Sequence, residues 1–160
     1  MTELVRTRGR SAPSDLAPTL SPVHVERLPA SANELYEAAV GALERSYSPY
    51  SHYPVGAAVR TASGRVFAGC NVENASFPLG TCAEAGAIAA MVLAGERDIV
   101  EVVTVTGGSE PGTPCGGCRQ RLREFAQPSA PVHATTIGGR LLTSTIADLL
   151  PHSFGPENLT

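Results

Sequence analysis

Three cysteines and one glutamate in this chain are spaced like residues that assemble a chemically active metal site. Cys82 precedes Glu84 by two residues, and Cys115 and Cys118 lie three residues apart after Pro114. Three thiolates leave the fourth position of a tetrahedral zinc ion open, as in catalytic rather than structural zinc sites. The Glu84 carboxylate then remains available as an acid and base beside the metal. The spacing therefore predicts Zn²⁺ held by Cys82, Cys115 and Cys118, with Glu84 as the catalytic residue.

Other interpretations of these residue types were weighed. A Cys-x-x-Cys pair alone is also typical of structural zinc sites and of redox pairs. A closed site needs a fourth protein ligand, and the sequence offers no well-spaced candidate. Cys70 falls in a predicted strand, which favours a small buried hydrophobic residue. The histidines at positions 52, 133 and 152 are scattered, which favours surface or loop roles.

Length and composition exclude several classes of protein. The 160 residues suit one domain, and 42% hydrophobic with 17% charged residues is an ordinary globular balance. A net charge of −3 at pH 7 argues against a nucleic acid polymer as partner. No apolar run reaches the roughly 18 residues of a membrane span. Prolines interrupt the N-terminal region, so no secretory signal is predicted, and a cytoplasmic location favours metal binding or catalysis over disulfides.

The elements that must position the cysteines follow from periodicity and turn residues. Residues 1–30 are interpreted as a flexible leader, with a short extended piece at 23–25, and residues 31–160 as the catalytic domain. Ser31 and Glu34 resemble a capping box that starts a helix running to about Ser46. The next expected elements are a loop at 47–52, hairpin strands at 55–61 and 65–71, and an irregular loop at 72–80.

The second half of the sequence predicts alternating helices and strands. A helix from Cys82 or Ala83 to Leu93 is apolar all round, so we expect it to be buried and to pack against another subunit. Residues 99–106 form the expected central strand, and a helix begins beside Cys115. Two short strands at 132–137 and 140–142 and a last helix capped by Ser144 or Thr145 complete an α/β fold. It has one sheet of about five strands with helices on both faces.

In this arrangement two helix N-termini meet at the metal. Cys82 and Cys115 start different helices, whose dipoles are expected to lower the thiol pKa values. A zinc ion there lowers the pKa of a bound water toward about 7. Glu84 is expected to take a proton from this water and to deliver protons to the substrate.

A Cys-x-Glu followed by Pro-Cys-x-x-Cys is the pattern of zinc-dependent nucleobase deaminases. Over longer blocks the chain resembles the small, homotetrameric cytidine deaminases. The blocks are residues 47–58, 69–76, 82–84, 114–120, 149–151 and 154–159. The resemblance implies a three-layer α/β/α sandwich around a mixed sheet. It also implies zinc-dependent hydrolysis of cytidine and 2′-deoxycytidine to uridine and 2′-deoxyuridine, with release of ammonia, in pyrimidine salvage. Neighbouring subunits of the tetramer would complete each active site.

The resemblance also implies a set of substrate contacts. They fall on Tyr53, Asn71, Glu73, Phe77, Ala83 and Phe154. Asn71 and Glu73 would hydrogen-bond the ribose, which makes free nucleobases poor substrates because buried acceptors would lose their partner. Tyr53 replaces a Phe that stacks on the pyrimidine, and the ring survives the change. Phe77 and Phe154 would reach a neighbouring subunit's pocket.

One position departs from the family. Ala85 follows Glu84, where much of the family has an Arg that donates hydrogen bonds to the zinc thiolates. Such donors tune the basicity of the ligands and of the bound water. Arg119, directly after Cys118, is the remaining candidate for this role.

Three further functions stay open at this point. One is a deaminase of a cytosine-nucleoside antibiotic, and another is a catalytically silent zinc scaffold, which the presence of Glu84 disfavours. The third is a cytosine deaminase or binder of nucleic acid, which the acidic balance and the lack of a basic aromatic groove disfavour.

Overall fold

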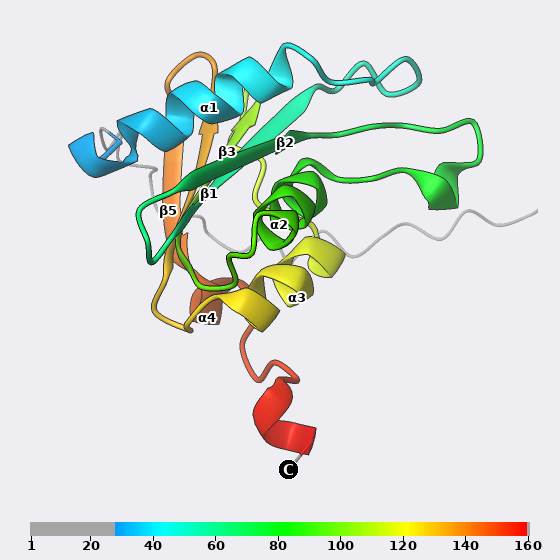
Figure 1. Cartoon of the computed structure of the whole chain (residues 1–160). Helices are drawn as coiled ribbons and strands as arrows, with labels where there is room; N and C mark the ends of the chain where they lie inside the picture. Colours follow the sequence, from blue (N-terminus) through cyan, green and yellow to red (C-terminus); the bar gives the residue numbers. More distant parts are fainter. Residues whose placement is uncertain (1–27, 160) are drawn as a thin grey trace, which may run out of the picture.

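The computed structural model describes residues 28–159, so most of the predicted leader, including residues 23–25, lies outside the described residues. Figure 1 shows the helices and strands along the chain. In order they are α1 (Asn33–Leu43), β1 (Val55–Thr61), β2 (Val66–Cys70), α2 (Ala83–Leu93), β3 (Ile99–Thr106), α3 (Gly116–Phe125), β4 (Pro131–Thr136), β5 (Leu141–Thr145) and α4 (Ile146–Leu149). Short 3₁₀ turns lie at Ala30–Ala32, Phe77–Leu79 and Pro156–Leu159. Within this part of the chain, no helix is both long and apolar enough to cross a membrane.

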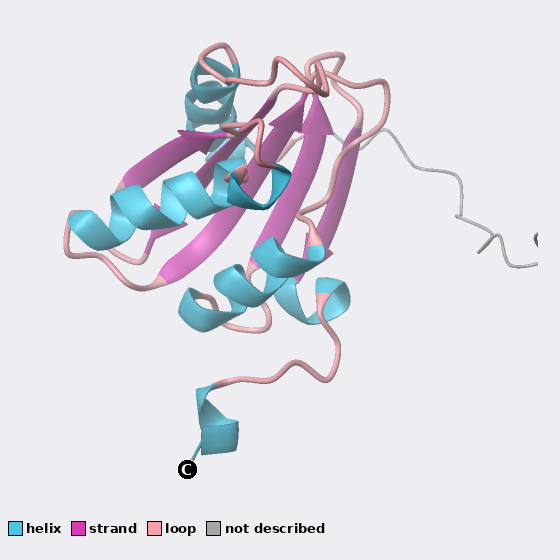
Figure 2. Cartoon of the chain, turned by 90° about the vertical axis from the view of Figure 1, so that its right-hand side faces the viewer, coloured by secondary structure: helices cyan, strands magenta, loops and turns pink. Residues whose placement is uncertain are grey.

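The strands form one mixed sheet in the order β2-β1-β3-β4-β5. β3 and β4 run parallel and are connected through α3, as a parallel pair requires, and the other neighbours are antiparallel. α1 covers one face of the sheet, and α2 and α3 lie against the other (Figures 1 and 2). The predicted α/β/α layers and the central position of β3 are therefore confirmed.

Each face of the sheet has its own hydrophobic core. On one face Leu35, Ala39 and Leu43 of α1 pack with Ala58 and with valines of β3. On the other, side chains of α2, α3 and α4 pack against the alternate residues of the same strands. β3 contributes to both cores because successive side chains of a strand point to opposite faces.

Glycines in β1 and β2 allow helix backbones to approach the sheet closely. A Cβ atom at Gly56 would lie 1.9 Å from the carbonyl oxygen of Ala39 in α1. A Cβ atom at Gly69 would lie 2.4 Å from the backbone nitrogen of Ala87 in α2. Real side chains do not tolerate such contacts, so both positions require glycine for the observed helix packing.

The start and end of α1 and the end of β5 differ from the sequence predictions. The Ser31–Glu34 capping box does not form, because a 3₁₀ turn precedes α1 and the N-cap is Ala32. The Glu34 carboxylate instead pairs with Arg60 at 2.9 Å, and Arg60 also donates to the Ser31 carbonyl. β5 continues to Thr145, past the predicted end at residue 142, and α1 ends at Leu43 rather than Ser46.

Helix α2 is buried on one side only. Ala83, Ala87 and Met91 face the sheet and are fully buried, whereas Leu93 is 90% exposed. The prediction that the whole helix is buried is therefore wrong for the single chain, and the further prediction that it packs against another subunit stays untested.

Candidate metal centre

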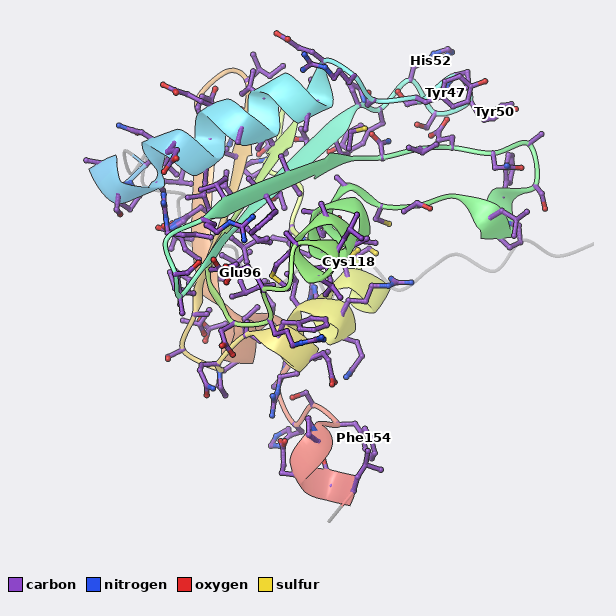
Figure 3. The ribbon with its side chains drawn as sticks, viewed as in Figure 1. Tyr47, Tyr50, His52, Glu96, Cys118 and Phe154 are labelled. Atoms are coloured by element: carbon purple, nitrogen blue, oxygen red, sulfur yellow. The ribbon has the colours of Figure 1, made fainter. Side chains whose placement is uncertain are left out.

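The N-termini of two helices bring the three cysteines together. Cys82 is the N-cap of α2 and Cys115 the N-cap of α3, and both have the extended backbone of that position. Cys118 lies one turn further into α3 and is fully buried. In Figure 3 it lies where α2 and α3 meet. The predicted meeting of two helix ends is confirmed.

The sulfur atoms have the separation that zinc requires. The Sγ atoms of Cys82, Cys115 and Cys118 all lie within 4.8 Å of one another, and those of Cys82 and Cys115 are 3.7 Å apart. Two sulfurs, each about 2.3 Å from one tetrahedral zinc, are about 3.8 Å apart. The residues present therefore fit Zn²⁺, and no other cluster of potential metal ligands occurs among residues 28–159.

The thiol pKa values differ from the expectation based on helix dipoles. Burial raises the pKa of Cys82, with contributions from the neighbouring Cys115. Burial also raises the pKa of Cys118, followed by the negative charge of Glu84. Burial likewise opposes ionisation of Cys115, but hydrogen bonds from Cys118 and Cys82 outweigh it and lower the pKa of Cys115. Desolvation thus dominates at two of the three thiols, so these thiolates need a cation beside them.

Glu84 lies in the first turn of α2, two residues beyond the N-cap, and is 5% exposed. Besides burial, the negative charge of Glu84 and its hydrogen bond with Cys118 raise the pKa of that thiol, so the two side chains lie close together. The carboxyl group therefore lies beside the sulfur cluster, as the Cys-x-Glu spacing predicts. It also lines the cavity described next.

A cavity of about 220 Å³ opens onto the cluster. Its lining includes Cys82, Cys115 and Glu84, together with three of the predicted substrate contacts, Tyr53, Asn71 and Ala83. The remaining lining residues are Val55, Thr106, Gly112 and Thr113. β1 begins and β3 ends at this edge of the sheet, so the loops that carry these residues converge there.

Asn71 and Tyr53 are held together at the cavity. The Asn71 side chain accepts a hydrogen bond from the Val55 N–H at 2.9 Å and donates to the Tyr53 carbonyl at 2.9 Å. The Asn71 side-chain oxygen can accept one more hydrogen bond and its nitrogen can donate one more, so both atoms remain available to a ligand. The Tyr53 ring packs against the turn after β3, where a Cβ atom at Gly112 would lie 3.0 Å from its hydroxyl oxygen.

Glu73 lines a second cavity of about 350 Å³, with Tyr50, Ser51, Asn74, Phe77 and Gly80. Its carboxylate accepts hydrogen bonds from the Tyr50 and Ser51 N–H groups at 2.9 and 3.2 Å and from the Ser51 hydroxyl. The Ser51 hydroxyl, followed by the Tyr50 N–H, lowers the pKa of Glu73 below its ordinary value of 4.5. These three hydrogen bonds therefore hold the Glu73 carboxylate in a fixed orientation.

The two predicted intersubunit phenylalanines are exposed in the single chain. Phe77 is 78% exposed on the loop between β2 and α2, where its ring meets Tyr50 edge-on. Phe154 is 58% exposed on the C-terminal tail, well apart from Cys118 in Figure 3. Neither lines the cavity at the cysteines, so any contact of Phe154 with an active site requires another copy of the chain.

Arg119 supports the loop that carries Cys115. Its guanidinium donates to the carbonyl oxygens of Pro114 and Leu149 at 2.7 and 2.9 Å and to the Thr113 hydroxyl at 3.0 Å. Hydrogen bonds from Arg119 to a cysteine sulfur are not among the contacts within residues 28–159. Its predicted role in offsetting the thiolate charge therefore stays a prediction, and Ala85 supplies no donor there.

Sequence reasoning did not assign several residues at the site. Ser51 belongs to a block on which the resemblance rests, but only the structure places its hydroxyl on Glu73. Thr106 lines the cavity from the end of β3, and Gly112 and Thr113 line it from the following loop, which has no distinctive spacing. Cys70 is only partly buried and donates to the Arg45 carbonyl at 3.6 Å, so its prediction as a buried residue is wrong.

Comparison with known proteins gives one consistent result. The family model for the cytidine and deoxycytidylate deaminase zinc-binding region matches residues 29–134. The cytidine deaminase of Sporosarcina psychrophila is 40% identical over 119 residues, which cover 74% of this chain and 88% of that protein. The cytidine deaminase of Mycobacterium tuberculosis H37Rv is 38% identical over 123 residues, which cover 77% of this chain and 86% of that protein. The crystal structure of the Burkholderia pseudomallei cytidine deaminase superposes with a TM-score of 0.73 at 42% identity, covering 76% of this chain and 98% of that one.

Proposed function

Since the chain belongs to the zinc-dependent cytidine deaminase family, we propose that it hydrolyses cytidine and 2′-deoxycytidine to uridine and 2′-deoxyuridine with release of ammonia. The observation that carries this proposal is a buried carboxyl group, Glu84, in the same cavity as a three-sulfur metal site. Three protein ligands leave one coordination position for water, and Glu84 is the acid and base that such a water needs.

Glu84 is the proposed proton carrier of the reaction. When bound, zinc would lower the pKa of a coordinated water toward about 7 and so supply the nucleophile. Glu84 would take one proton of this water and deliver it to the ring nitrogen, and would then take the remaining proton, from the hydroxyl now attached to the ring carbon, and deliver it to the departing amine. Its burial excludes bulk water that would compete for these protons.

Residues of this cavity and of the second cavity bind the nucleoside. Tyr53 offers an aromatic face to the pyrimidine, and Asn71 hydrogen-bonds the ribose. Glu73, which lines the second cavity, accepts a hydrogen bond from a ribose hydroxyl. Ala83, fully buried at the first position of α2, contacts the base beside the metal. Because Glu73 is already ionised and anchored, a substrate without a sugar leaves its acceptor unpaired, which disfavours free cytosine.

We also propose that the active form is a homotetramer in which neighbours complete each site. The exposure of Phe77 and Phe154 supports this, since both rings are free to contact a neighbouring subunit at the positions that the resemblance assigns to such a contact. The three ligand thiols need reducing conditions, which supports a cytoplasmic enzyme of pyrimidine salvage. Size-exclusion chromatography with light scattering tests the assembly, and a monomeric active enzyme would contradict it.

An ultraviolet assay of zinc-loaded protein tests the activity. Cytidine and 2′-deoxycytidine should lose absorbance, and kcat/KM for free cytosine should be at least about 100-fold lower. Glu84→Gln should lower kcat by about 10²- to 10⁴-fold while zinc content is unchanged. No turnover of either nucleoside would contradict the proposal. An aminoacyl cytosine-nucleoside antibiotic, added to the same assay, tests the alternative substrate. If the protein deaminates none of these compounds, a catalytically silent zinc scaffold is favoured.

A further inference from the structure

The loop between α1 and β1 contains one hydroxyl group that contacts both proposed nucleoside-binding elements. Ser51 Oγ donates a hydrogen bond to Glu73 Oε1, on the segment after β2. The same oxygen accepts a hydrogen bond from the Tyr53 N–H at 3.1 Å. Ser51 thus links the carboxylate proposed to bind the sugar with the residue proposed to stack on the base.

The contacts of Glu73 determine which of its lone pairs remains available. The other carboxylate oxygen, Oε2, accepts from the N–H groups of Tyr50 and Ser51 at 2.9 and 3.2 Å. With the Ser51 hydroxyl, three of the roughly four acceptor positions of a carboxylate are occupied. The remaining position is on Oε1, the oxygen that Ser51 holds. The hydroxyl of Ser51 therefore orients the one acceptor position that the contacts among residues 28–159 leave for a ligand.

The backbone between Ser51 and Tyr53 is bent to allow the second contact. His52 has a φ of 54°, in the left-handed region that few residues other than glycine adopt. Its N–H closes the turn on the Ser48 carbonyl at 3.0 Å. This turn directs the Tyr53 N–H back to Ser51 Oγ, and Asn71 holds the Tyr53 carbonyl from the other side. Tyr53 is therefore fixed at both backbone polar groups.

We propose that Ser51 is a positioning residue whose single hydroxyl sets the Glu73 carboxylate and the Tyr53 ring relative to each other, so that sugar and base are recognised together. This rests on the proposed function, in which Glu73 and Tyr53 contact the nucleoside. Ser51 acts through these two residues, so its loss should weaken binding of nucleosides and leave the reacting groups at the metal in place.

The test compares zinc-loaded, full-length Ser51→Ala, Ser51→Thr and Ser48→Ala with the wild type. Ser48 lies in the same loop, and its hydroxyl makes none of the hydrogen bonds found among residues 28–159, so Ser48→Ala is the matched control. Ser51→Ala should raise KM for cytidine about tenfold, with kcat within about twofold, because a hydrogen bond to a charged group is lost. Ser51→Thr keeps the hydroxyl and should restore KM to within about threefold of the wild type, and Ser48→Ala should not change it.

A double-mutant cycle with Glu73→Gln separates positioning from a general structural effect. If Ser51 acts through Glu73, adding Ser51→Ala to Glu73→Gln should raise KM by no more than about threefold further, so the effects should not be additive. A variant that merely folds less well would instead show a lower kcat and a lower zinc content, with KM unchanged. Wild-type KM in Ser51→Ala, or fully additive effects with Glu73→Gln, would overturn this inference alone. A wild-type protein that does not deaminate cytidine would overturn the proposed function itself.

Discussion

The contact between β2 and α2 predicts that one added methyl group disturbs a metal site it does not touch. A Cβ atom at Gly69 would lie 2.4 Å from the Ala87 nitrogen and 2.5 Å from the Ala83 carbonyl oxygen. Both are backbone atoms of α2, so no side chain can turn away to make room. Ordinary contact begins near 3.4 Å, and α2 must therefore move away from the sheet by about 1 Å in Gly69→Ala.

The size of the effect follows from this displacement. Overpacking of this kind costs about 1–3 kcal/mol, and in a chain of this length each kcal/mol lowers Tm by about 2–4 °C. We therefore expect Tm to fall by about 2–12 °C. Cys82 and Glu84 lie at the start of α2 and Cys115 on α3, so moving α2 also separates parts of the site. A misplacement of about 1 Å can lower kcat/KM by about 100-fold.

Gly86 offers a matched control on the facing side of the same contact. A Cβ atom there would lie 3.5 Å from the Gly69 Cα and 3.7 Å from the Cys70 carbonyl oxygen, which is ordinary packing. Because alanine is favoured over glycine inside a helix by about 1 kcal/mol, Gly86→Ala should raise Tm by about 2–4 °C. Thermal denaturation, zinc content and kcat/KM of both zinc-loaded variants test the reasoning. It is refuted if Gly69→Ala keeps wild-type values in all three measurements.

Three other perturbations test separate parts of the site. Arg119→Ala removes three hydrogen bonds around the loop before Cys115 and should lower zinc content and Tm. Arg119→Lys should restore little, because one ammonium group cannot hold three separated acceptors. Full zinc content and turnover in Arg119→Ala would contradict a role of Arg119 in supporting the metal site. Chelation of zinc should abolish deamination and lower Tm, and zinc should restore both, whereas an unchanged Tm in the metal-free protein would show that the ion does not stabilise the fold. The pKa of Glu73 is lowered in the folded protein, so its acceptor form is present above the ordinary value of 4.5 and is lost as pH falls through the lower folded value. The ratio of cytidine KM between Glu73→Gln and wild type should therefore reach the midpoint of its change below pH 4.5, and a midpoint at or above pH 4.5 would show that the pKa of this carboxylate is not lowered.

Elements with a strong local pattern could be predicted from sequence, and those set by distant contacts could not. The β-branched run of β3 and the alanine-rich α2 match their predicted ranges, and Gly95 ends α2 with a φ of 87°. Thr145 caps α4 as one of the two predicted residues, through a capping box with Asp148. The capping box predicted at Ser31 fails because Arg60, on a strand far along the chain, takes the Glu34 carboxylate. Local spacing contains no information about such a partner.

The same distinction applies at the site. The metal ligands and Glu84 could be predicted because their spacing reflects the first turns of two helices, each with a cysteine at its N-cap. The pKa directions of Cys82 and Cys118 could not, because burial raises both pKa values and burial depends on the complete fold. Ser51 could not be assigned either, because its partner Glu73 approaches it only after β1 and β2 pair.

The origin of the three sulfurs in two separate helices also affects how the protein folds and keeps its metal. Cys115 and Cys118 are neighbours along the chain and can bind zinc weakly before the fold is complete. Cys82 can join them only after the chain between positions 82 and 115, which includes β3, has folded back and brought α2 against α3. Zinc then acts as a crosslink between two segments far apart in sequence, so bound zinc should oppose the separation of α2 from α3. Local opening of this helix pair should therefore be rarer in the zinc-loaded protein than in the metal-free protein.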